Sequence, residues 1–151
     1  MTTPKTPQTA TASLVAALAE LDNVKANKIN PAFKAKYVSL DALLDAIKPV
    51  LLDHDLALIQ TLVSEDGKVG VSTAFLHASG ERFDFGKLMV KADGLTAQQI
   101  GGAITYIRRQ SIQTACGISV DLDDDGAVAS AGFRPAASVA PAPATPRPLT
   151  R

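Results

Sequence analysis

Three consecutive segments in the middle of the chain alternate apolar and polar residues, and this alternation constrains the fold more than any other feature. The segments span residues 56–63, 69–77 and 81–90. A period of two residues is typical of β-strands, and the pairs Asp66-Gly67 and Ser79-Gly80 between the segments favour tight turns. The pattern therefore predicts an antiparallel three-stranded meander.

Apolar residues recur at helical spacing on both sides of the predicted meander. Two helices are expected before it, over residues 13–24 and 39–55, with Ser13 and Ser39 as N-caps. Pro49 has no backbone N–H, so the second helix should kink or restart there.

A third helix is expected after the meander, from about Ala97 to Cys116. Thr96 and Gln99 form the sequence pattern of a capping box at its start. The order helix, helix, three strands, helix predicts an α+β domain in which the helices pack on one face of the sheet.

The composition limits what the chain can be. Its 151 residues suffice for one domain, and 15 basic and 15 acidic residues give no net charge, so only local clustering could attract a polyanion. The single cysteine excludes an intramolecular disulfide and a cysteine-based zinc site. With no signal peptide or apolar run long enough for a membrane span, we expect a cytoplasmic protein. The expected organisation is a disordered tail (1–12), one domain (13–130) and a Pro- and Ala-rich disordered tail (131–151).

Enzymatic motifs are absent from the sequence. The closest approach to a P-loop, residues 80–88, has five residues between its glycines instead of four, and Leu88 occupies the position of the Ser or Thr. The two histidines lie in different predicted elements, and no G-x-S-x-G motif is present. We therefore expect no enzymatic activity and no cofactor.

An acidic run follows the third predicted helix. Asp121, Asp123, Asp125 and Gly126 match the first positions of an EF-hand loop, but Gly132 stands where the loop needs a bidentate Glu. No metal site is assigned on this basis, and a solvated acidic loop is the simpler interpretation. A divalent cation such as Mg²⁺, held loosely by Asp123, Asp124 and Asp125, remains an alternative.

The third predicted helix carries two glycines and two arginines. Helical spacing places Gln98, Gly102, Thr105, Tyr106 and Arg109 opposite the apolar face, with Gly101 and Arg108 at the border. Each helical glycine costs about 1 kcal/mol relative to alanine, so the pair indicates a close approach by a packed strand, a neighbouring subunit or a ligand. Arginine binds phosphates and tyrosine stacks on bases. Alternatively, the glycines admit a crossing strand and the arginines pair with the acidic run.

A second segment gives an independent signal for nucleic-acid binding. Residues 25–37 contain four lysines and two aromatic residues but no acid: Lys25, Lys28, Lys34, Lys36, Phe33 and Tyr37. A basic groove with aromatic platforms is what sequence-tolerant binding of single strands requires. The alternative is a solvated loop.

Residues 96–126 resemble the signature block of the ERF (essential recombination function) family of phage and prophage single-strand annealing proteins. Residues 36–60 and 75–81 are similar to two further blocks, and the resemblance covers roughly residues 14–128. The matching motif residues are Gln99, Gly101, Gly102, Ala103, Ile104, Thr105, Tyr106, Arg108, Arg109, Asp123, Asp124, Asp125 and Gly126. Gly102 replaces the usual Ser, and Gln110 replaces a Tyr, which removes an aromatic ring.

The resemblance implies a β-β-β-α core and ATP-independent annealing of single-stranded DNA in phage-type homologous recombination. It also implies a homo-oligomer, as a ring or filament, in the cytoplasm of a bacterial host, and the C-terminal tail is a candidate contact for host recombination or replication proteins. The predicted DNA-binding residues are Lys25, Lys28, Lys34, Lys36, Tyr37, Gly101, Gly102, Thr105, Tyr106, Arg108 and Arg109. The alternatives are a passive single-stranded DNA-binding protein that does not anneal and a phage interaction or scaffold module.

Overall fold

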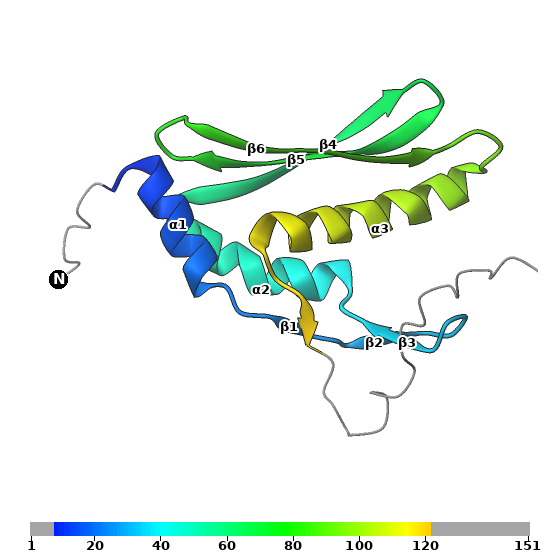
Figure 1. Ribbon diagram of the computed structural model, residues 1–151, viewed down its shortest axis with the longest axis horizontal. Coiled ribbons are helices and arrows are strands. Elements are labelled where there is room, and N and C mark those ends of the chain that lie inside the picture. Colours follow the sequence, from blue (N-terminus) through cyan, green and yellow to red (C-terminus); the bar gives the residue numbers. More distant parts are fainter. Residues whose placement is uncertain (1–7, 122–151) are drawn as a thin grey trace, which may run out of the picture.

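The predicted meander forms the central sheet of the computed structural model, which describes residues 8–121 (Figure 1). Strands β4 (Leu56–Glu65), β5 (Lys68–His77) and β6 (Arg82–Lys91) pair antiparallel in the order β4-β5-β6. The helices lie on one side of this sheet in Figure 1, as the sequence predicted for an α+β domain.

Three helices cover this face of the sheet: α1 (Ala10–Glu20), α2 (Leu40–Asp53) and α3 (Ala97–Cys116). Helix α3 packs against β5 and β6, α2 packs against β4, and α1 packs against α2. None of the helices in the described part of the chain is long and apolar enough to cross a membrane.

The helix ends confirm two of the three predicted caps. Ser39 caps α2, and the Thr96 capping box opens α3 with both of its reciprocal hydrogen bonds to Gln99. The prediction for α1 was wrong. This helix begins at Ala10 with Thr9 as its N-cap, and Ser13 is buried inside it.

Pro49 does not interrupt α2, contrary to expectation, since the helix is continuous from Leu40 to Asp53. Because proline has no backbone N–H, the carbonyl of the residue four positions earlier, here Asp45, receives no hydrogen bond from it. Both residues are exposed, so water can solvate that carbonyl. The cost of the missing hydrogen bond is therefore small enough for the buried face of α2 to maintain the helix.

The core lies between the sheet and the helices. Leu58, Phe75 and Phe83 are paired across the three strands and face the helices, and Phe75 is fully buried. Cys116, at the end of α3, is only 4% exposed, and this burial raises the pKa of its thiol to about 11. The thiol is therefore neutral and unreactive in the folded protein, so its reactivity reports unfolding.

Four short strands lie on the far side of the helices from the sheet (Figure 1). Strand β1 (Val24–Lys25) pairs in parallel with β7 (Val120–Asp121), and β2 (Lys28–Asn30) pairs antiparallel with β3 (Ala35–Tyr37). None of these four short strands was predicted from the sequence. Residues 28–37 are called the basic hairpin below.

Two hydrogen bonds attach the base of the basic hairpin to the start of α2. The side-chain amide of Asn27 donates to the Ser39 hydroxyl at 2.9 Å, and the Ser39 backbone N–H donates to Asn27 Oδ1 at 2.8 Å. Ser39 thus both caps α2 and fixes where the hairpin leaves the helical layer.

Candidate nucleic-acid interface

An arginine between two tyrosines joins the basic hairpin to α3. The Arg109 guanidinium carbon lies 4.7 Å from the centre of the Tyr37 ring and 5.5 Å from the centre of the Tyr106 ring. Both distances are within the range of a cation–π interaction. These residues, called the Tyr37–Arg109–Tyr106 cluster below, unite the two segments that the sequence analysis identified separately.

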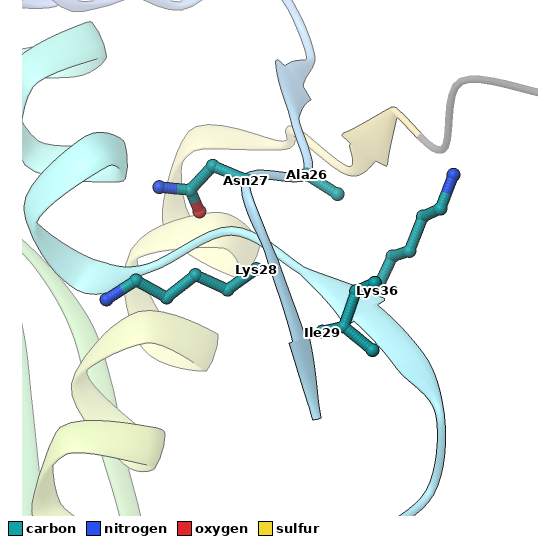
Figure 2. A pocket seen from close by; sticks show the side chains of 5 residues that line it. All are labelled: Ala26, Asn27, Lys28, Ile29 and Lys36. Carbon is teal, nitrogen blue, oxygen red and sulfur yellow. The ribbon is translucent and has the colours of Figure 1, made fainter. Parts of the chain in front are cut away.

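The register of the basic hairpin distributes its side chains over two faces. Lys28 is paired with Tyr37, whereas Ile29 is paired with Lys36. Because directly opposed residues share a face, Lys28 lies on the same face as Tyr37, and Lys36 lies on the other face with Ile29. Figure 2 shows the Lys28 and Lys36 side chains extending in opposite directions from the hairpin.

The four predicted lysines therefore do not line one continuous groove. Lys25 belongs to β1, and Lys34 lies in the turn at the hairpin tip with a positive φ of 52°. Lys36 and Ile29 border an open hollow of about 430 Å³ that is also lined by Ala26, Asn27 and Lys28. The sequence could not separate these positions because the strand pairing of this segment was not predicted.

Lys28 lies close to the start of α2. The pKa of Asp41 is lowered mainly by a hydrogen bond with the Ser39 hydroxyl. The positive charge of Lys28 lowers this pKa further. Asp41 is thus ionised at neutral pH near Lys28. Among the hairpin lysines, Lys28 is the one whose strand register places it beside the Tyr37–Arg109–Tyr106 cluster.

The exposed face of α3 continues from the cluster toward the start of the helix. Tyr106 is 54% exposed, and Thr105, Gly101 and Gly102 are also exposed. The Thr105 hydroxyl donates to the Gly101 carbonyl at 3.1 Å. Apart from the neighbouring backbone of α3 itself, a Cβ atom built on Gly101 or Gly102 meets no described atom within 4 Å. The crossing-strand alternative is therefore wrong for residues 8–121, and packing within this part of the chain does not explain the glycines.

Arg108 points away from the cluster although it is adjacent to Arg109. Its Nε donates to Gln60 Oε1 at 3.1 Å, and Gln60 Nε2 donates to the Arg108 carbonyl oxygen at 3.1 Å and to the Thr73 hydroxyl at 3.1 Å. These bonds attach α3 to β4 and β5. Gln60 was not among the predicted site residues. It shares the helix-facing side of β4 with Leu58 and Leu62, and a polar residue between two leucines on that side is a signal that could have identified it.

The family follows from a sequence comparison. The sequence model of the ERF superfamily matches residues 11–140, which includes the basic hairpin, the sheet and α3. The chain belongs to the ERF superfamily. No curated protein and no solved structure gives a significant match.

Membership in the ERF superfamily supports a general role in phage-type DNA recombination and strand annealing. The match includes all the residues of the Tyr37–Arg109–Tyr106 cluster and also the acidic run. The structure does not describe the acidic residues Asp123, Asp124 and Asp125 or the following Gly126. The alternative in which the acidic run pairs with the arginines therefore falls outside the described residues. Residues 8–121 of this ERF-family chain contain no group of three His, Cys, Asp or Glu side chains that could hold a metal ion.

Proposed function

We propose that this ERF-family chain binds single-stranded DNA with the basic hairpin and the exposed face of α3, and anneals complementary strands without a nucleotide cofactor. The observation that carries the proposal is the Tyr37–Arg109–Tyr106 cluster, in which one guanidinium contacts two aromatic rings on a partly exposed surface. Arginine can bind the phosphates of a single strand, and tyrosine can stack on the faces of its bases.

The proposed mechanism is one of positioning and involves no bond making or breaking. Arg109 and Lys28 hold the backbone through its phosphates, and Tyr106 supports a base by stacking, an interaction of about 1–3 kcal/mol per base. A strand held mainly by its backbone keeps the pairing edges of its other bases accessible. Pairing with a complementary strand then supplies the free energy that drives annealing.

One copy of the domain contacts few phosphates, so we propose that several copies act along one strand as a homo-oligomer. Linked copies raise the local concentration of binding sites, so that modest individual affinities combine. Within residues 8–121, the outer edges of β4 and β6 have no partner strand. Unpaired edges of this kind are available for contacts between copies.

Intrinsic tyrosine fluorescence tests where the strand binds. The chain has two tyrosines and no tryptophan, and both tyrosines belong to the cluster. We expect oligothymidylate to quench this fluorescence because stacked bases and displaced side chains change the surroundings of both rings. Tyr37→Phe and Tyr106→Phe each keep a ring but remove one fluorophore, so each variant reports on the other tyrosine.

N-acetyltyrosinamide mixed with the same oligonucleotide corrects for light absorbed by the DNA. Quenching in the wild type and in both variants is the expected result. Binding detected by a labelled strand, with unchanged emission from both tyrosines, would contradict the proposed location of the site.

The glycine pair of α3 gives a second test, in which stability and binding should change in opposite directions. Replacing Gly101 and Gly102 together with alanine should raise the free energy of unfolding by about 2 kcal/mol, because each helical glycine costs about 1 kcal/mol and the added methyl groups meet no described atom. The same methyl groups should weaken binding of single-stranded DNA if the strand lies against this face. Urea denaturation and fluorescence anisotropy measure the two effects. A more stable variant with unchanged affinity would remove these glycines from the site.

A further inference from the structure

Phe33 is the most exposed large apolar side chain in the described part of the chain, at 81%. It lies in the turn of residues 31–34 that joins β2 and β3, at the tip of the basic hairpin. Apolar side chains exposed to this degree contribute nothing to the core, and an exposed aromatic ring at the tip of a projecting element is well placed to contact a partner.

The tip has a defined backbone shape without being packed. The Asn30 side-chain oxygen accepts a hydrogen bond from the Ala32 N–H at 3.0 Å, and Pro31 restricts its own φ. Lys34 then adopts a left-handed conformation with φ of 52°. These features fix the turn, so Phe33 is presented on a preformed loop and the entropy lost on binding is reduced.

The charge around Phe33 indicates the chemistry of its partner. Lys34 is the next residue and Lys36 follows in β3, and residues 23–40 contain no acid. Two hairpin tips of this composition would repel each other, which disfavours a contact between equivalent tips of two copies. A flat apolar group attached to a polyanion can stack on the ring while its charges are attracted to the lysines. A nucleobase in a DNA strand is such a group.

We propose that Phe33 is a second stacking position, which holds a nucleobase of the bound single strand at the tip of the basic hairpin. The inference rests on the proposed function and extends its site. Tyr37 at the end of β3 and Phe33 at the tip would then contact the same strand, with Tyr37 held by Arg109 and Phe33 free of packing in the described structure.

Titration of labelled oligothymidylate against four proteins tests this inference: the wild type, Phe33→Ala, Phe33→Trp and Val15→Ala. Phe33→Ala should weaken binding roughly 5- to 150-fold, the effect of losing one base stack. Phe33→Trp should bind like the wild type, and the emission of its tryptophan, the only one in the chain, should be quenched by the strand. Val15→Ala removes another exposed apolar side chain, on α1, and should bind like the wild type.

A strand of the same length built from abasic sites separates stacking from charge. It keeps the phosphates but has no bases, so wild type and Phe33→Ala should bind it equally. The unreactive Cys116 thiol verifies that each variant is folded.

Three results would overturn the inference while the proposed function stands. The first is a Phe33→Ala variant that binds the strand as tightly as the wild type does. The second is an equal loss on abasic and normal strands, which would assign the effect to the shape of the hairpin. The third is a smaller sedimentation coefficient of DNA-free Phe33→Ala, which would make Phe33 a contact between copies. If the wild type binds no single-stranded DNA, the proposed function fails and this inference fails with it.

Discussion

Arg109→Ala is expected to weaken binding of single-stranded DNA by about 10- to 100-fold. Hydrogen bonds to a charged group contribute about 1.5–3 kcal/mol, and the substitution also removes the cation–π contacts to Tyr37 and Tyr106. Fluorescence anisotropy with a labelled oligothymidylate at fixed salt measures the change. Arg109→Lys keeps the charge but lacks the planar guanidinium, so its affinity should be intermediate.

Arg108→Ala is the matched control, because it removes the same charge from the adjacent position. Its guanidinium bonds to Gln60 and not to the cluster, so its loss should lower the free energy of unfolding by about 1.5 kcal/mol and affect DNA binding less than Arg109→Ala. An Arg108→Ala variant that loses as much affinity as Arg109→Ala, or more, would place the strand on the β4 side of α3 instead.

Gly70→Ala is expected to lower the free energy of unfolding by about 3 kcal/mol, at the upper end of the usual cost of overpacking. A Cβ atom at this position would lie 2.1 Å from the Leu88 carbonyl oxygen and 2.7 Å from the Met89 Cα. Both are backbone atoms of the neighbouring strand, so β5 and β6 would have to separate locally. Urea denaturation measures the loss, and reaction of the Cys116 thiol provides an independent probe of the same transition.

The control for Gly70→Ala is Gly101→Ala, a replacement of the same kind at a glycine where the added methyl group meets no described atom. It should stabilise the protein by about 1 kcal/mol. If Gly70→Ala unfolded at the same urea concentration as the wild type, the close pairing of β5 with β6 at this position would be wrong.

The meander, α2 and α3 could be predicted from local sequence signals, whereas the four short strands β1, β2, β3 and β7 could not. Alternation over the strands fixed the meander, because side chains on a half-buried sheet must alternate between core and solvent. Helix α3 has the predicted bounds, since a capping box opens it and Gly117, with φ of 64°, closes it in a left-handed conformation. The start of α1 was missed because Thr9 lies in a Thr-, Pro- and Ala-rich stretch that resembles a disordered tail.

The candidate site could be predicted only in part. Helical spacing was sufficient to place Tyr106 and Arg109 on one exposed face, because residues three positions apart are neighbours on a helix. The contact of Arg109 with Tyr37 depends on how the basic hairpin folds back beside α3, and no local pattern encodes that arrangement. The different environments of Arg108 and Arg109 likewise follow from the position of Gln60 on β4, a tertiary relationship.

Strand annealing without a nucleotide is the measurement that tests the central claim most directly. Two complementary labelled oligonucleotides are mixed with the protein at low and moderate salt, with and without Mg²⁺, and duplex formation is followed over time. The account predicts faster annealing with the wild type and with Arg108→Ala, and little or no acceleration with Arg109→Ala. Wild-type protein that binds single strands without accelerating duplex formation would contradict it and indicate a passive coating protein.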